Sequence, residues 1–275
     1  KNIFNKFFSK IYVINLDDKT TRWKKVKTQF ARRGVKIERF SAIDGRCKSV
    51  KECKGKKKKF EAKYNITMEK PDWQDWKLFL PASSLTIGTI LILREQVKNK
   101  WPHILICEDD IVLGKNLVSK FETGIKEIKK DKLNWDLLYL GCGHFCGTKD
   151  ISYNKTKRNK FRSTLSDFDG YDEMYVANKE EIRVVCNKER PCPSKTKHLS
   201  FPSMPGGTWC YAVSLKGAKK LLKFLDNHIY NMIDLTERKA IMSGKIKALA
   251  FDPPIVWHEE GAFRTDSDIP WRWED

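Results

Sequence analysis

The segment His103–Leu113, "HILICEDDIVL", places three consecutive acids between two apolar runs and guides the interpretation of the whole chain. The apolar residues on both sides predict one buried strand that continues through the segment. Neighbouring carboxylates repel one another, and each costs free energy to remove from water. Glu108, Asp109 and Asp110 at the end of a core strand therefore need something that compensates their charge.

Strands and helices are expected to alternate on both sides of this segment. The expected strands are Lys10–Asp17, Val35–Gly45 with its turn, His103–Leu113, Trp135–Gly141 and the first part of Gly206–Leu225. The expected helices are Asp18–Gly34, Ala82–Val97, Leu117–Lys132 and the last part of Gly206–Leu225. This order predicts a single α/β domain over residues 1–275, with a mainly parallel sheet flanked by helices.

Two segments interrupt the alternation. Arg46–Lys70 is expected to be a basic loop, and its densest run, "KGKKKK" at Lys54–Lys59, is expected to be mobile. Cys142–Ser200 is polar, lysine-rich and without clear periodicity, so we expect a long insertion there. Structureless connections of this size are uncommon unless they serve a function.

The composition is that of a globular protein with a strong positive charge. Hydrophobic residues make up 40% of the 275 residues, and the net charge is +19. No run of about 18 apolar residues is recognised, so no membrane span is expected, and no signal peptide is recognised. The charge has two interpretations, a solvated lysine-rich surface or attraction to anions. No nucleic acid is expected as a partner, since the lysine runs lack interleaved aromatic residues.

The eight cysteines do not form a clear metal motif. Cys107 lies in the predicted core strand and is expected to be a plain buried thiol. Cys142, Cys146, Cys186 and Cys192 have spacings that are loose for a zinc site, so disulfides or free thiols are favoured.

The position of the acids favours a ligand site. In open α/β sheets, ligands bind beyond the carboxyl ends of the strands. Alternation along a strand places Glu108 and Asp110 on one face and Asp109 on the other. Two carboxylates on one face suit a hard divalent cation with positions left open for phosphate oxygens. A strand-end turn with exposed acids is the alternative.

Six motifs in the same order resemble glycosyltransferase family 25. They are "YVINLD...RW" (Tyr12–Trp23), "ERFSAIDG" (Glu38–Gly45), the acid segment, "WDLLYLG" (Trp135–Gly141), "YAVSLKGAKKLL" (Tyr211–Leu222) and a late "WH" (Trp257–His258). The family comprises collagen β-galactosyltransferases, bacterial lipopolysaccharide galactosyltransferases and giant-virus relatives. The resemblance implies a GT-A-type fold, Mn²⁺ and a UDP-sugar donor.

The resemblance also implies roles for individual residues. It assigns the metal to Glu108, Asp110 and His258. It assigns the donor nucleotide to Asn15, Leu16, Arg22, Trp23, Ala42, Asp44 and Asp109. Two of these roles have structural alternatives. His258 is the metal ligand or a plain surface histidine, and Trp23 contacts the nucleotide or packs in the core on the buried face of its helix.

An inverting transferase needs a base that deprotonates the acceptor hydroxyl. Asp234, in "NMIDLTE", matches the family's acidic position after the "GAKKLL" helix, and Glu237 is the second catalytic candidate. The family's next residue, Glu, is replaced here by Leu235. A capping box formed by Asp234 and Glu237 is the alternative. The family's histidine before its long helix is also missing, since "SSLTI" (Ser83–Ile87) stands there.

The sequence thus predicts an inverting, Mn²⁺-dependent UDP-galactose transferase whose acceptor is a hydroxyl such as collagen hydroxylysine. A UDP-glucose or UDP-N-acetylglucosamine transferase with a glycan acceptor is the nearest alternative. An inactive basic scaffold or nucleic-acid-binding protein is the alternative of another class. A homodimer is left open. So is the location, either the lumen of the secretory pathway or the cytoplasm of a virus-infected host cell.

Overall fold

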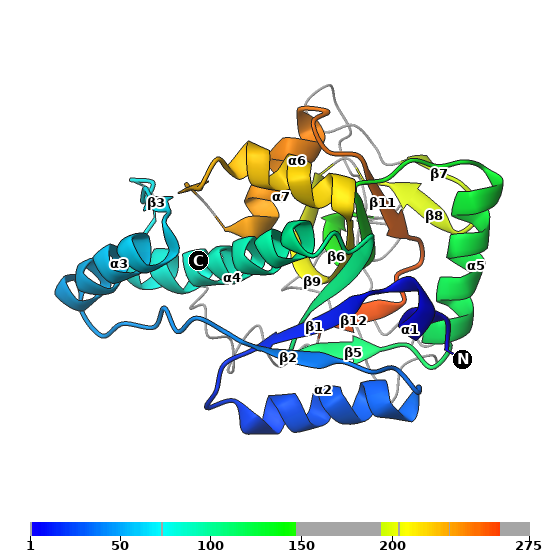
Figure 1. The fold of residues 1–275 in the computed structure, drawn as a ribbon, viewed down its shortest axis with the longest axis horizontal. Helices are drawn as coiled ribbons and strands as arrows, with labels where there is room; N and C mark the ends of the chain where they lie inside the picture. Colours follow the sequence, from blue (N-terminus) through cyan, green and yellow to red (C-terminus); the bar gives the residue numbers. More distant parts are fainter. Residues whose placement is uncertain (1, 73, 147–193, 203, 231, 259–275) are drawn as a thin grey trace, which may run out of the picture.

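The computed structural model describes residues 2–72, 74–146, 194–202, 204–230 and 232–258 of the chain. Its centre is an eight-stranded mixed sheet with helices on both faces (Figure 1). The strand order is β2 (Glu38–Ser41), β1 (Lys10–Asn15), β4 (His103–Glu108), β9 (Met204–Ser214), β6 (Leu137–Phe145), β11 (Ala248–Phe251), β8 (Leu199–Phe201) and β7 (Ser194–Lys195).

Most of these strands run in one direction. β2, β1 and β4 pair in parallel, and so do β6 and β11. β9 is antiparallel to both β4 and β6, and β8 is antiparallel to both β11 and β7. Six of the eight described strands therefore point the same way, which confirms the expected α/β sandwich of the GT-A type.

Two apolar clusters cover the two faces of the sheet. One face carries α3 (Val50–Tyr64), α4 (Trp76–Lys98), α6 (Leu215–Leu225) and α7 (Ile233–Met242), and the other carries α1 (Ile3–Phe7), α2 (Thr20–Arg32) and α5 (Leu117–Lys130). Alternation along β4 supplies both clusters, since Ile104 and Ile106 join the first and Leu105 and Cys107 the second. The central strands are buried on both sides, which explains their unbroken apolar runs.

The acid segment is not one continuous strand, and that prediction was wrong. β4 ends at Glu108, and a separate strand, β5 (Ile111–Leu113), follows Asp109 and Asp110. β5 leaves the main sheet and pairs antiparallel with β12 (Val256–His258). The chain turns at the acids because each half of the segment satisfies its backbone in a different sheet.

The prediction of a basic loop at Arg46–Lys70 was also wrong, because most of this segment is helix α3. The Ser49 hydroxyl accepts from the Glu52 N–H at 3.2 Å, and the Glu52 carboxylate accepts from the Lys48 N–H at 2.8 Å. This arrangement is close to a capping box, and lysine is a good helix former. The "S-V-K-E" pattern before the lysine run was the local signal that identifies the helix. After α3, β3 (Thr67–Met68) pairs with β10 (His228–Ile229).

Helix α4 begins at Trp76, six residues before the expected start, because Asp75 caps it through the Lys77 N–H. Pro81 lies inside the helix. Contrary to the sequence expectation, α4 is long and apolar enough to cross a membrane by length and composition. However, 67% of its most apolar window is buried inside the fold, as in the core helix of a globular protein.

The cysteine predictions have mixed outcomes. Cys107 is a buried thiol, as expected, and its Sγ lies 2.7 Å from that of Cys210 on the neighbouring strand β9. Cys142 is bonded to Cys146, and a second disulfide that the sequence did not indicate joins Cys47 to Cys53. Cys186, Cys192 and most of the expected insertion, residues 147–193, lie outside the described residues.

Candidate active site

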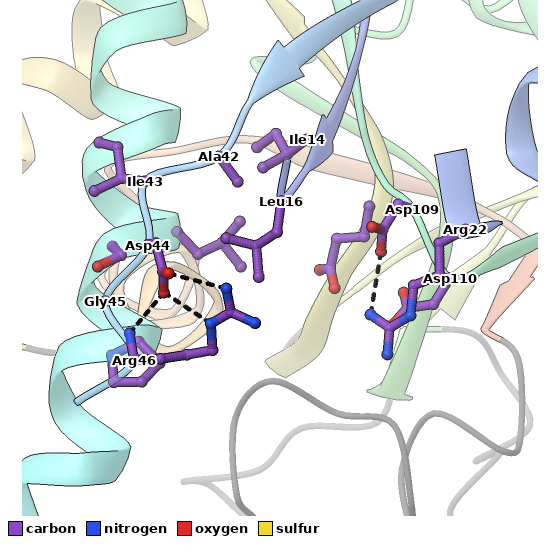
Figure 2. Close-up of a pocket in the computed structure, with 14 residues that line it drawn as sticks. Ile14, Leu16, Arg22, Ala42, Ile43, Asp44, Gly45, Arg46, Asp109 and Asp110 are labelled. Atoms are coloured by element: carbon purple, nitrogen blue, oxygen red, sulfur yellow. Dashed lines mark hydrogen bonds and ion pairs between the residues drawn. The ribbon is translucent and has the colours of Figure 1, made fainter. Parts of the chain in front are cut away.

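A pocket opens beyond the carboxyl ends of β1 and β4 (Figure 2). Its walls come from the end of β1, the segment after β2, the first half of α4 and the acid segment. Of the residues assigned to the donor nucleotide, Leu16, Arg22, Ala42, Asp44 and Asp109 line it. These residues are far apart in sequence, and the parallel pairing of β1 with β2 and β4 brings them to one edge of the sheet.

All three acids line this pocket, which corrects the expectation that Asp109 faces away from the other two. Strand alternation holds only within a strand, and β4 ends at Glu108. Asp109 accepts hydrogen bonds from the Asn15 side-chain amide at 2.5 Å and from Arg22 Nη1 at 3.4 Å. The Arg22 guanidinium also lies 3.8 Å from Asp110, so one cation compensates two of the acids.

The other two residues assigned to the nucleotide lie behind the pocket wall. Asn15 is buried, and besides Asp109 its side chain bonds the Lys19 carbonyl and the Arg39 guanidinium. Asn15 therefore holds Asp109 in place. Trp23 packs on the apolar cluster of α2 and is not in the pocket lining, as its structural alternative predicts.

Glu108 and Asp110 have opposite electrostatic environments. Burial, reinforced by the negative charge of Asp110, raises the pKa of Glu108 to about 7, although Thr208 donates a hydrogen bond to it at 2.8 Å. Burial acts in the same direction on Asp110, but the hydrogen bond and charge of His258 and the charge of Arg22 outweigh it and lower the pKa. The Asp110 Oδ1 atom is buried, and no described residue gives it a hydrogen bond.

His258 reaches the acids through the pairing of β12 with β5, which sets it opposite Ile111. Its Nε2 atom lies 3.5 Å from Asp110 Oδ2, and only 10% of its side chain is exposed. The imidazole also lies against the Trp209 ring, with centroids 5.6 Å apart. The alternative of a surface histidine was therefore wrong.

Asp234 lies in the first turn of α7 and does not cap it. The N-cap position belongs to Met232, so the structure excludes the alternative of a capping box formed by Asp234 and Glu237. Asp234 Oδ1 accepts from the N–H of Leu235, and Oδ2 accepts from the Gly207 N–H at 3.2 Å. Since Thr208 bonds Glu108, two consecutive residues of β9 connect Asp234 to the acid segment.

Glu237 is fully buried and is not in the pocket lining. The Tyr139 hydroxyl donates a hydrogen bond to it at 2.6 Å. Burial raises its pKa to about 8. Asp234 is not in the pocket lining either, but it is only half-buried, so it is the one of the two acids that an acceptor can approach.

Sequence analysis missed two residues that shape the site. Thr208 gave no signal, because only the pairing of β9 with β4 brings it to Glu108. Arg46 donates to both carboxylate oxygens of Asp44 at 2.9 Å and to Asp18 at 2.8 Å, and its hydrogen bond lowers the pKa of Asp44. The "D-G-R" sequence at Asp44–Arg46 was the available signal for this contact.

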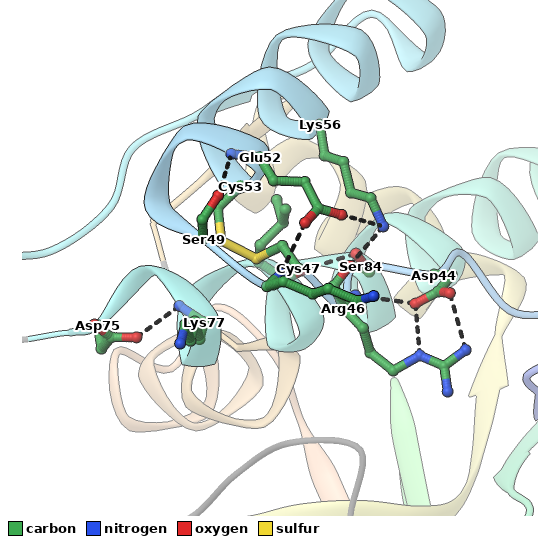
Figure 3. The surroundings of a disulfide bond; sticks show 12 residues. Asp44, Arg46, Cys47, Ser49, Glu52, Cys53, Lys56, Asp75, Lys77 and Ser84 are labelled. Atoms are coloured by element: carbon green, nitrogen blue, oxygen red, sulfur yellow. Dashed lines mark hydrogen bonds and ion pairs between the residues drawn. A yellow bond between two sulfur atoms is a disulfide. The ribbon is translucent and has the colours of Figure 1, made fainter.

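The pocket wall is fastened to α3 and α4 (Figure 3). The disulfide between Cys47 and Cys53 joins the wall to the first turns of α3, and Lys56 Nζ donates to the Arg46 carbonyl at 2.5 Å. Gly45 lies directly on α4, where a Cβ atom would overlap the Ser84 hydroxyl and the Leu80 carbonyl. Only glycine therefore fits between Asp44 and Arg46 without displacing the helix.

The residues assigned to the metal are close together but do not form a preformed cluster. Within the described ranges, no group of three or more His, Cys, Asp or Glu side chains is arranged to hold a metal ion. Glu108, Asp110 and His258 nevertheless lie close together beside the pocket, and one buried carboxylate oxygen of Asp110 lacks a hydrogen bond. Glu108 and Asp110 line the pocket, whereas His258 lies outside its lining and beside Asp110.

Two comparisons with known proteins bear on this site. A model described as "Glycosyltransferase family 25 (LPS biosynthesis protein)" matches residues 8–242, which include the acid segment and Asp234 but not His258. A mouse protein, "Procollagen galactosyltransferase 2", is 23% identical over 138 residues. The matched segment covers 49% of this chain and 21% of the mouse protein, so the chain corresponds to a minor part of that relative.

We predict opposite effects for two glycine substitutions. Gly45→Ala should destabilise the protein by about 1–3 kcal/mol, because the new methyl group overlaps the α4 backbone. Gly55→Ala, at an open position in α3, should instead stabilise it by up to about 1 kcal/mol through helix propensity. Urea unfolding of the two variants measures both changes. Equal midpoints would contradict the close contact of Gly45 with α4.

Proposed function

The chain belongs to glycosyltransferase family 25, and we propose that it transfers galactose from UDP-galactose to an acceptor hydroxyl such as that of collagen hydroxylysine. The observation that carries the proposal is that Glu108 and Asp110, with His258 beside Asp110, lie at a pocket lined by the motifs that resemble the family's nucleotide-binding segments. The galactose and the collagen-like acceptor are suggested by the name of the mouse relative.

We assign the divalent cation, Mn²⁺ in this proposal, to Glu108, Asp110 and His258. The chemistry of these groups fits, since carboxylate oxygens and a neutral imidazole both suit Mn²⁺. The unpartnered Asp110 Oδ1 provides a ligand atom, and a nearby cation also favours the ionised form of Glu108. When bound, the cation stabilises the negative charge of the departing UDP.

The donor nucleotide occupies the rest of the pocket in this proposal. Leu16, Ala42 and Ile43 supply apolar surface for the uracil ring, and Asp44, held by Arg46, is placed to accept hydrogen bonds from ribose hydroxyls. Arg22 adds positive charge beside the acids, where it favours the diphosphate. The residues of this chain therefore bind and orient the donor before transfer.

Asp234 is the base in the proposed reaction. In an inverting transfer, the acceptor oxygen attacks the anomeric carbon from the face opposite the leaving UDP, and a carboxylate takes its proton. The Gly207 N–H donates to one oxygen of Asp234 and fixes its orientation beside β9. The carboxylate is half-buried, so one side of it is open to an approaching acceptor.

One experiment separates the proposed function from two alternatives, a different sugar donor and a basic scaffold without activity. A glucose or N-acetylglucosamine donor with a glycan acceptor would use the same nucleotide pocket. A basic scaffold without activity would explain the net charge of +19 but gives no reason to bury acids beside His258. A panel of UDP-sugars with Mn²⁺, with UDP release followed in the presence and absence of a hydroxylysine acceptor, separates these candidates. EDTA abolishes activity in the enzyme but not anion binding by a scaffold.

We expect Asp110→Ala to lower Mn²⁺-dependent transfer by at least about 10²-fold, because it removes the carboxylate between His258 and Arg22. The protein should stay folded, since the ionised side chain is costly to bury. Asp131→Ala, at an exposed position after α5, is the control. Unchanged turnover in a folded Asp110 variant would remove the proposed cation site.

UDP should raise the melting temperature strongly only when Mn²⁺ is present. A ligand at 100 times its Kd stabilises the native state by about 2.7 kcal/mol, and the diphosphate needs the cation to offset the nearby acids. Thermal denaturation with UDP in Mn²⁺ and in EDTA measures the difference. An equal shift in EDTA would argue against a diphosphate bound through the cation.

We expect Asp234→Asn to lower the transfer rate by about 10²–10⁴-fold, because the amide cannot accept the acceptor's proton. UDP affinity and the melting temperature should change little, since the amide oxygen can still accept from the Gly207 N–H. Transfer rate, UDP affinity and melting temperature are measured on one preparation. Near wild-type transfer would refute the assignment of the base.

A further inference from the structure

Glu237 is a buried acid that the proposed reaction does not use. We propose that it is a positioning residue: as an un-ionised acid bonded to Tyr139, it holds helix α7, and with it Asp234, against strands β6 and β9. The inference rests on the proposed function insofar as Asp234 acts as the base. The protonation of Glu237 is independent of that assignment.

The contacts of Glu237 connect α7 to the centre of the sheet. Its side chain is fully buried, and its Oε2 atom accepts from the Tyr139 hydroxyl of β6 at 2.6 Å. The phenol of Tyr211, on the neighbouring strand β9, lies beside Tyr139 with tilted rings whose centroids are 5.8 Å apart. Its hydroxyl and the Glu237 Oε1 atom are both buried without a hydrogen-bond partner among the described residues. An un-ionised carboxyl accepts from Tyr139 through one oxygen and carries its proton on the other, so no charge is buried there.

The charges around Glu237 oppose its ionisation. The titratable groups that act on it are the two phenols, Asp234 one turn earlier in α7, and Glu108 at the end of β4. A carboxylate here would be a buried charge facing two further acids, which is unfavourable. Burial, with the charges of Asp234 and Glu108, raises its pKa to about 8, so the group keeps its proton at neutral pH.

Displacing α7 would disturb both halves of the site. Asp234 accepts from the Gly207 N–H, and Arg238 donates to the Pro205 carbonyl at 2.9 Å. Thr208 follows directly and donates to Glu108. Asp234 and Arg238 of α7 therefore hold the first part of β9, and Glu237 bonds the neighbouring strand β6. The first part of β9 in turn holds an acid of the pocket.

The test compares four variants: Glu237→Gln, Glu237→Ala, Tyr139→Phe and the control Glu122→Gln, at a half-buried position of α5 that pairs with Lys126 far from α7 in sequence. Glutamine can still accept from Tyr139 but never ionises. Glu237→Gln should therefore keep transfer within about twofold of wild type at pH 6.5 and hold it at pH 9, where wild-type transfer falls. Glu237→Ala should lower kcat by about tenfold or more with little change in UDP affinity. Tyr139→Phe removes only the hydroxyl and should lower kcat less.

A second measurement does not require activity. The folded-state pKa of Glu237 lies above its ordinary value of 4.5, so the folded protein holds the proton more tightly. Stability should therefore fall as pH rises from about 4.5 to about 8, with the unfolding constant increasing by up to about tenfold per pH unit from this group. Glu237→Gln should lack this contribution, whereas Glu122→Gln should keep the wild-type dependence.

Three results would overturn the inference. Equal loss of transfer in Glu237→Gln and Glu237→Ala at pH 6.5 would show that the carboxyl itself does chemistry. A wild-type dependence of stability on pH in Glu237→Gln would show that Glu237 does not hold a proton. Wild-type kcat in both Glu237→Ala and Tyr139→Phe would exclude positioning. If no UDP-sugar is turned over, the proposed function fails, while the dependence of stability on pH still decides the protonation of Glu237.

Discussion

Strand β9 runs between β4 and β6 and is antiparallel to both. This pairing is the constraint on which the rest of the site depends. It sets Thr208 beside Glu108, and it presents the Gly207 N–H to Asp234 on α7. Because one strand contacts both the acid segment and the candidate base, the two halves of the site cannot move independently. The parallel strands on either side contribute the pocket wall and the core.

The three consecutive acids are tolerated because each has a different environment. Asp109 accepts from Asn15 and Arg22, and Asp110 interacts with Arg22 and His258. Glu108 accepts from Thr208 and has a raised pKa, so it binds a proton more readily than an ordinary glutamate. Ion pairs, hydrogen bonds and partial protonation thus offset the repulsion between the three acids that the sequence suggests. Glu237 is stabilised in a similar way in the core: its raised pKa keeps it protonated, so it adds no negative charge near Asp234 and Glu108.

Part of the positive charge of the chain is concentrated in helix α3. Helix α3 contributes a run of lysines, of which Lys56 and Lys57 pair with Glu52 and Glu61 one turn away. The helix is fastened to the pocket wall by the disulfide between Cys47 and Cys53. The lysine-rich segment is therefore part of the support of the pocket.

The sequence by itself determined the elements whose signal is local or periodic. The apolar runs predicted β1, β4 and β6, the helical spacing of Val26 and Phe30 predicted α2, and the ordered motifs predicted the family. The capping pattern at Ser49–Glu52 also indicates where α3 begins, although the lysine run after it led us to expect a loop. These features depend on residues a few positions apart, so a linear pattern contains them.

Only the tertiary structure decided the contacts between distant residues. The break after Glu108 depends on β5 pairing with β12, about 145 residues later in the chain, and the same pairing brings His258 to Asp110. The burial of Glu237 depends on Tyr139 in β6, 98 residues earlier. Strand pairing satisfies backbone groups of any residue type, so the side chains leave little trace of which strand lies beside which. The sequence therefore identified the candidate acids, and the packing of β5, β9 and α7 assigned their partners.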